Sequence, residues 1–212
     1  MTSEIIEYCK TSRQDFRTSY FYCREGDPSQ NTCLAVYKSL LNQMLSHHRE
    51  MLPYCDEKRL KVSSEVLGDE NTARLLVERF CDAELNQFIV IDGLDEIDLM
   101  QRRLLIQFLA AMVRKCDQYN PGKLRILFVS HDLPDMRRMK CLESTTILEL
   151  DPDDTQKAIK LFVDMKLVVI NEKFGMKNED LERARKMTID RSDGGPHPSF
   201  TKSNNVLMLI TI

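Results

Sequence analysis

Residues 88–96 read Phe-Ile-Val-Ile-Asp-Gly-Leu-Asp-Glu, and this stretch decides the fold. Its first four residues are apolar without alternation, which is typical of a strand that helices cover on both faces of a parallel sheet. Asp92 ends the run, and Gly93 lets the backbone turn sharply after it. Because open parallel sheets bind ligands at the carboxyl ends of their strands, the stretch predicts an α/β fold with an acidic site at that edge.

The residues that follow predict a strand–helix–strand unit. A second apolar run spans residues 125–130, and Asn120-Pro121-Gly122 marks a turn before it. Two buried strands joined by one helix form a parallel crossover. Between the two runs, apolar residues recur at helical spacing: Met100, Leu104, Leu105, Phe108, Leu109, Met112, Val113 and Cys116.

The same criteria assign the rest of the chain. Thr72 is expected to cap a helix whose inward face carries Leu75, Leu76 and Phe80. A Gly-Gly-Pro break precedes residues 195–212, which are expected to form an irregular tail. The remaining expected elements are helices over 2–12, about 29–48, 72–85, 154–170 and 178–190, and strands over 18–23 and 146–150.

The composition is that of a soluble globular protein, with 42% hydrophobic and 30% charged residues in a chain of 212. A net charge of −3 gives no electrostatic reason to expect a nucleic-acid partner. No apolar run approaches the ~20 residues that span a bilayer, so we expect no membrane partner. Seven cysteines without a C-x-x-C pair and four scattered histidines favour reduced thiols in a cytoplasmic protein over a disulfide framework or a zinc site.

The acidic residues after the first apolar run fit the chemistry of nucleoside triphosphate hydrolysis. Such a site needs one carboxylate that holds Mg²⁺ against the β- and γ-phosphates and a second acid that orients the attacking water. Asp92 suits the first role. Gly93 allows Asp95 or Glu96 to face the same cleft as Asp92.

Two other interpretations of this acidic stretch fit it to different degrees. A calcium loop of the EF-hand type starting at Asp92 would need an oxygen ligand at Leu94 and a glycine at Ile97, and both positions are wrong. A solvated acidic turn that caps the helix starting near Asp98 stays open, and capping is compatible with binding magnesium.

The second apolar run also ends in polar residues. Ser130 closes the run, and His131 opens the loop that leaves the same edge of the sheet. A polar side chain at this place could contact the γ-phosphate of a bound nucleotide. Taken alone, a serine that merely ends a strand is the simpler interpretation.

Together these segments resemble NACHT domains in their order and spacing. The nearest type is the nephrocystin-3-like N-terminal NACHT domain of filamentous fungi, which belongs to the STAND signalling NTPases, and the resemblance covers about residues 2–194. The segments that carry it are SYFYC at 19–23, DPSQNTCLAVYKSLLNQML at 27–45, FIVIDGLDEID at 88–98, KLRILFVSHDLPDMRR at 123–138 and ILEL at 147–150.

The resemblance implies a three-layer, P-loop NTPase-like parallel sheet in which FIVIDGLDE matches the Walker B motif. By it, Asp92 would bind Mg²⁺, Asp95 and Glu96 would polarise the attacking water, and Ser130 and His131 would occupy the sensor-1 position beside the nucleotide. Mg²⁺ and ATP or GTP would be the cofactors. Other NACHT or STAND domains, or effector domains, would be the partners, and nucleotide-dependent signal transduction would be the role of the full-length protein.

Two features depart from the family pattern. No G-x-x-x-x-G-K-[ST] phosphate loop occurs, and the first glycine is Gly26, so we expect the Walker A loop and the strand before it to lie upstream of Met1. His131 stands where the family usually has arginine. A histidine is mostly neutral at pH 7, so the fixed positive charge at this position is lost.

The family sheet order, 5-1-4-3-2, leaves a gap where the first strand would lie, between the strands at 125–130 and 146–150. Unpaired backbone groups beside that gap would destabilise the sheet unless the strand at 146–150 finds a new partner. We therefore expect a partial nucleotide-binding core over 1–150, a helical extension over 151–194, and a tail over 195–212 outside the family pattern.

For this chain we expect weak nucleotide binding and little or no hydrolysis, because the acidic residues are present and the phosphate loop is not. The alternative is a non-enzymatic fragment that docks on an intact relative, or a degenerate gene product. A metal-dependent hydrolase that uses the acids at 92–98 without nucleotide comes third, since no histidine completes its site.

Overall fold

The computed structural model describes residues 2–12, 15–47, 49–53, 55, 68–82, 86–149, 152–192 and 206–211. The chain divides into two compact units, one formed by Met1–Leu148 with Val206–Ile212 and the other by Glu149–Asn205. The first unit is an α/β sheet structure and the second is helical. The predicted α/β class, with parallel strands followed by C-terminal helices, is confirmed.

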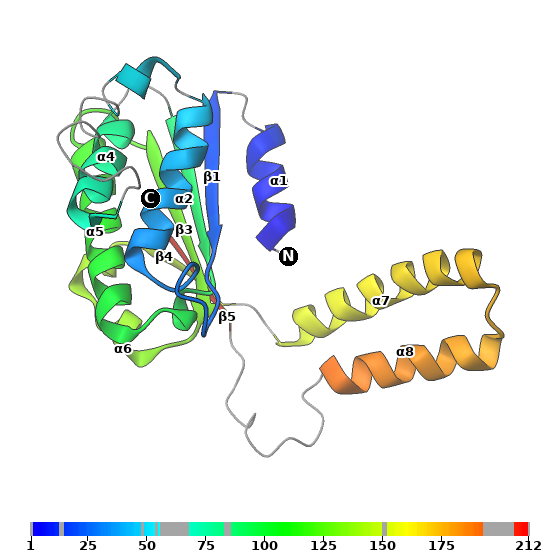
Figure 1. The fold of residues 1–212 in the computed structure, drawn as a ribbon. Coiled ribbons are helices and arrows are strands. Elements are labelled where there is room, and N and C mark those ends of the chain that lie inside the picture. The colour runs from blue at the N-terminus through cyan, green and yellow to red at the C-terminus, as the bar shows by residue number, and fades with distance from the viewer. Residues whose placement is uncertain are drawn as a thin grey trace. The chain divides into compact units, whose positions relative to one another are not determined.

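Parallel strands form the centre of the first unit (Figure 1). In register, Ile89 lies between Ser19 and Ile126 of the neighbouring strands. The predicted crossover unit is therefore present, and its two strands are adjacent. The parallel strands are β1 (Phe16–Tyr22), β2 (Asn86–Asp92) and β3 (Leu124–His131).

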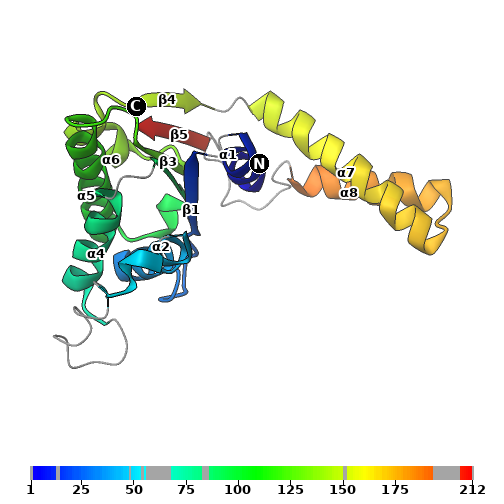
Figure 2. The ribbon, with the colours of Figure 1, turned by 90° about the horizontal axis from the view of Figure 1, so that it is seen from above.

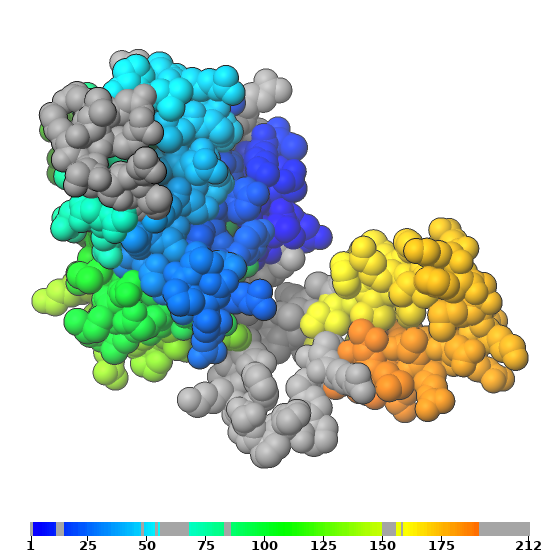
Figure 3. All heavy atoms as spheres, in the orientation of Figure 1, coloured from blue at the N-terminus to red at the C-terminus, as the bar shows by residue number. Residues whose placement is uncertain are grey.

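Helices cover both faces of these strands (Figure 2). Ile89 and Ile91 belong to the larger core, whereas Val90 points to the opposite face of the sheet. Ile6 of α1 is buried on that opposite face. This two-sided burial explains why the apolar run does not alternate. In Figure 3, α2 forms part of the outer surface of the first unit on the face of the larger core. The helices on that face are α2 (Cys33–His47), α4 (Glu70–Asp82) and α5 (Leu99–Asp117), and α1 (Thr2–Ser12) lies on the other.

The strand order is β1-β2-β3-β5-β4, and it differs from the expectation at one place. Residues 195–212 were expected to be irregular, but β5 (Val206–Thr211) pairs antiparallel with β3, from Ile126 to His131. β5 lies in the gap that the expected order leaves, and β4 (Thr146–Glu149) lies outside it. The physical reason is that β3 has backbone N–H and C=O groups on this side, and the apolar run at 206–210 pairs with them.

At the opposite edge of the sheet, a side chain forms hydrogen bonds with the backbone of the edge strand β1. Gln43 of α2 accepts a hydrogen bond from the Tyr20 N–H at 3.0 Å and donates one to the Tyr20 carbonyl at 2.7 Å. The amide thus takes the place of a neighbouring strand along part of β1. Such contacts reduce the tendency of an edge strand to pair with another chain.

Some details of the helix predictions need correction. α4 is capped by Asp69, whose carboxylate accepts from the Thr72 N–H at 2.7 Å, so Thr72 is the partner of the cap and not the cap itself. Leu75, which was expected to face inward, is 53% exposed, and Leu104, part of the apolar spacing that predicted α5, is 55% exposed. Each precedes a core position by one residue, and one residue rotates a side chain by about 100° around a helix. Met100 is also exposed.

The second unit contains α7 (Pro152–Phe174) and α8 (Asn178–Ser192), which extend both predicted helices. Val163 and Ile189 are buried, and Arg185 donates to both carboxylate oxygens of Asp164 at 2.6 and 3.1 Å. The short helices of the first unit are η1 (Arg49–Met51), η2 (Leu94–Glu96), α6 (Pro134–Arg137) and η3 (Lys140–Leu142).

All seven cysteines carry free thiols, and three of them are buried. Within the described residues, no helix combines the length and the apolar character that crossing a membrane requires.

Candidate functional site

The carboxyl ends of the three parallel strands meet at one edge of the sheet. Tyr22 lies beside Asp92, Asp92 lies beside Val129, and the Cys23 N–H donates to the Asp92 carbonyl at 2.8 Å. The site residues predicted from the sequence all belong to this edge: Asp92 ends β2, Asp95 and Glu96 lie in η2, and Ser130 and His131 end β3.

Gly93 makes the turn after β2 possible. Its φ of 73° lies in the left-handed region, which L-residues with a side chain rarely adopt. A Cβ atom added here would lie 3.1 Å from the Cys23 carbonyl oxygen. Both the backbone conformation and the close approach of the β1 end therefore favour glycine.

Asp92 is half-buried and lies at the N-terminal end of α1. Its carboxylate accepts hydrogen bonds from the Thr2 hydroxyl and the Gly93 N–H. Burial raises the pKa of the Asp92 carboxyl above its usual value, and these two hydrogen bonds only partly oppose that effect. The carboxylate would thus be stabilised by a nearby cation.

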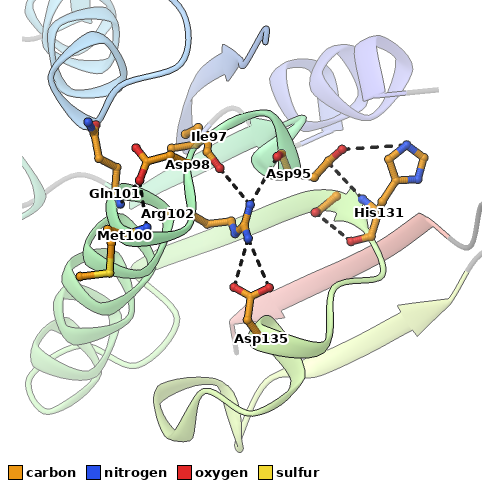
Figure 4. Close-up of polar contacts among 9 residues, drawn as sticks. Asp95, Ile97, Asp98, Met100, Gln101, Arg102, His131 and Asp135 are labelled. Carbon is orange, nitrogen blue, oxygen red and sulfur yellow. Dashed lines mark hydrogen bonds and ion pairs between the residues drawn. The ribbon is translucent and has the colours of Figure 1, made fainter. Parts of the chain in front are cut away.

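Asp95 holds the end of β3 (Figure 4). Its Oδ1 accepts from the His131 N–H at 3.1 Å, and its Oδ2 lies 3.9 Å from His131 Nε2. The Asp95 side chain is 17% exposed, whereas that of His131 is 54% exposed. The imidazole is therefore open to solvent while the carboxylate faces the protein.

Glu96 and Ser130 also bond to backbone groups. Glu96 Oε2 accepts from the Glu25 N–H at 3.0 Å, in the loop between β1 and α2. The Ser130 hydroxyl is buried and donates to the His131 carbonyl at 2.9 Å. The acids of η2 thus bind the segments that follow β1 and β3, and their roles toward nucleotide or water stay predictions.

The acids nevertheless gather around one side chain. The pKa of the Cys23 thiol is raised to about 12, first by its burial and then by the negative charges of Asp92, Asp95 and Glu96. Cys23 thus stays protonated at neutral pH and lies within reach of three carboxylates. A site with this concentration of negative charge favours a cation over an anion.

Arg102 is a site residue that the sequence analysis did not identify. It is buried in α5, and its Nη1 donates to the carbonyls of Ile97 at 2.9 Å and Asp95 at 3.3 Å. Its Nη2 lies 3.2 Å from both carboxylate oxygens of Asp135 in α6 (Figure 4). Arg102 therefore fastens the turn after β2 to the segment after β3.

A signal for Arg102 was present in the sequence. Its position continues the core-facing spacing of α5, three and four residues before Leu105 and Ile106. A charged residue at a core position is rarely buried unless it is paired. Such a residue beside an acidic turn indicates a buried ion pair.

The described residues contain no group of three or more His, Cys, Asp and Glu side chains that could hold a metal ion. Magnesium at nucleotide sites is commonly bound through one or two carboxylates, with water and phosphate oxygens as the other ligands. Asp92 is suited to be the single protein ligand of such an ion, because its carboxyl is half-buried at the carboxyl edge of the sheet and its pKa is raised.

Comparison with known protein families gives a match within the first unit. The family described as "Nephrocystin 3, N-terminal" matches residues 1–131, which is more than half of the chain. The matched region includes α1 and the parallel strands up to His131, with every site residue predicted from the sequence. No curated protein and no solved structure matches the chain.

Proposed function

This chain belongs to the nephrocystin 3 N-terminal family, and we propose that it is a NACHT-type nucleotide-binding domain of the STAND class. In this proposal it binds Mg²⁺ with ATP or GTP weakly and hydrolyses it little. The observation that carries the proposal is Asp92, a half-buried carboxyl with a raised pKa at the carboxyl edge of a parallel sheet. Asp92 would hold the magnesium ion.

The weak binding follows from the residues that the chain offers to phosphate. Its sequence has no glycine-rich phosphate loop with lysine. A bound Mg²⁺ would supply the positive charge that neutralises the phosphates. Asp95 bonds to the His131 backbone and Glu96 to the Glu25 backbone, so orienting a water molecule would require one of them to leave its partner.

The family resemblance supports the wider role. In a full-length STAND protein, exchange of nucleotide at this edge would reorganise contacts with neighbouring domains and transmit a signal in the cytoplasm. Other NACHT or STAND domains, or effector domains, would be the partners.

The test is a titration of the purified chain with a fluorescent ATP analogue, with and without Mg²⁺. We expect binding that depends on Mg²⁺ and weakens about tenfold in Asp92→Asn. Asp98→Asn is the matched control, because it removes one exposed negative charge nearby and asparagine also caps helices. A chain fused to a G-x-x-x-x-G-K-[ST] loop should bind more tightly. Equal binding by parent and Asp92→Asn would refute the assignment of Asp92.

One observation favours a second candidate, a non-enzymatic interaction module. The carboxylates of Asp95 and Glu96 fasten loops, as they would in a rigid docking surface. This candidate predicts no nucleotide binding and a stable complex with an intact member of the family. Size-exclusion chromatography of the mixture would decide between the two.

A further inference from the structure

A groove in the first unit lies away from the acidic turn, between the outer face of α5 and the segment that contains α6 and η3. Its volume is about 540 Å³. Arg103 and Arg114 line it from α5, and Arg138 and Lys140 line it from the segment after β3. Four cationic side chains thus converge on one hollow in a chain whose net charge is −3.

The positive charge of this groove is not neutralised locally. Asp135 is the one acidic residue among its lining, and both of its carboxylate oxygens are bonded to Arg102. Within the described residues, the side chains of Arg103, Arg138 and Lys140 form no ion pair, and Arg114 donates only to the Cys141 carbonyl, at 3.5 Å.

The neighbouring residue Arg137 shows what local neutralisation looks like. It donates to both carboxylate oxygens of Asp132, at 2.6 and 3.0 Å, and it does not line the groove. The segment therefore pairs one arginine internally and directs Arg138 and Lys140 into the hollow. Like charges held together raise the free energy of the folded state, and a bound anion would lower it.

The volume of the groove and the donors that line it indicate the class of anion. Its volume falls in the range of small-molecule sites, about 300–1,000 Å³. Three of its four cations are arginines, whose planar fork matches the oxygens of phosphate in pairs. Met139 and Cys141 also line it and give it a partly apolar wall.

We propose that this groove is a binding site for a small polyanion that carries phosphate groups. It is separate from the proposed nucleotide site, because none of its lining residues belongs to the acidic turn after β2. It is linked to that turn through Arg102, which pairs with Asp135 and donates to the Asp95 carbonyl.

The experiment uses the full chain, with sodium tripolyphosphate as the probe. Isothermal titration calorimetry measures the binding of the probe at low and at physiological salt. We expect saturable binding that weakens with salt, and a rise of the melting temperature with the probe. The double variant Arg103→Gln/Arg138→Gln should bind at least about tenfold more weakly, since two charge-assisted contacts are lost. Without the probe, this variant should melt at the same or a higher temperature than the parent, because charge repulsion is relieved.

The matched control is Arg183→Gln combined with Lys186→Gln, which removes two positive charges from exposed positions of α8. It should change the affinity less than about twofold. Equal weakening by control and groove variants would overturn the site, because the binding would then follow net charge alone. No saturable binding by the parent would overturn it too.

Two further measurements distinguish this proposal from the nucleotide proposal and from binding of acidic protein segments. With Mg²⁺ left out of the buffer, the nucleotide site proposed at Asp92 has no cation for phosphate, so Asp92→Asn should leave tripolyphosphate binding unchanged. Failure of the nucleotide proposal therefore does not affect this one. A hexaglutamate peptide should bind far more weakly than tripolyphosphate. If the peptide binds as tightly, the groove recognises acidic protein segments, and the assignment to phosphate is wrong.

Discussion

The turn after β2 and the strand β5 both border β3 but make different kinds of contact with it. The turn is fixed by particular side chains: Gly93 shapes it, Arg102 binds its carbonyls, and Asp95 bonds the end of β3. β5 pairs with β3 through backbone groups. The difference teaches that the turn should be sensitive to single side-chain changes, whereas β5 should respond mainly to changes in the backbone.

The largest effect is expected from Arg102→Met. It leaves the Asp135 carboxylate without its cation in a mostly buried place, and breaking a buried pair costs about 3 kcal/mol or more. Urea unfolding measures the loss. Arg103→Met, one residue along α5 and exposed, should change stability by less than about 0.5 kcal/mol.

A double variant sharpens this result. Arg102→Met with Asp135→Leu removes both charges, so it should recover most of the stability that the single variant loses. If Arg102→Met alone costs less than about 1 kcal/mol, the ion pair does not fasten the turn, and the proposed contrast with β5 fails.

The next effect concerns β5. Leu209→Pro removes a backbone donor opposite Phe128 and should lower the free energy of unfolding by about 2 kcal/mol. Leu209→Thr keeps the backbone N–H and introduces a residue that is common in strands, so it should lower the free energy of unfolding by less than about 1 kcal/mol. Hydrogen exchange of the β3 amides is the sharper readout, since only the proline variant should accelerate it. Similar losses in both variants would mean that side chains, and not backbone pairing, hold β5.

Gly93→Ala is expected to have a smaller effect on stability. The left-handed conformation costs a residue with a side chain about 1 kcal/mol, and the close Cys23 carbonyl adds to that. Gly26→Ala is the control, because Gly26 has a similar φ of 75° with nothing within 4 Å of the added atom. Thermal melting should show a larger loss at Gly93. Equal losses would show that the approach of β1 does not constrain the turn.

The smallest effect is expected from Asp92→Asn. The folded-state pKa of Asp92 is raised, so the folded protein binds this proton more tightly than the unfolded chain. The ionised carboxylate therefore destabilises the fold at pH values above the folded pKa, and this penalty disappears as the pH falls below about 4.

Asp92→Asn should consequently be slightly more stable than the parent at pH 7 and equal to it at pH 3. Unfolding free energies measured across this range, without Mg²⁺, test the sign. A variant that is less stable at pH 7 would show that the hydrogen bonds from Thr2 and Gly93 outweigh the burial.

The sequence determined the parts of the fold whose signal lies within one segment. The apolar run before Asp92 predicted a strand buried on both faces, and the structure places it between β1 and β3. The spacing of Leu105, Leu109 and Val113 predicted α5. These predictions succeeded because a run of apolar side chains must be buried wherever its partners come from.

The tertiary structure decided what depends on partners distant in sequence. β5 was missed because an apolar stretch at 206–210 carries no information on the strand that it will pair with. The burial of Arg102 needed Asp135, and the bonds of Asp95 and Glu96 needed backbone groups of His131 and Glu25. Hydrogen bonds are directional and require two groups at one place, so only the assembled fold specifies which carboxylate binds which partner.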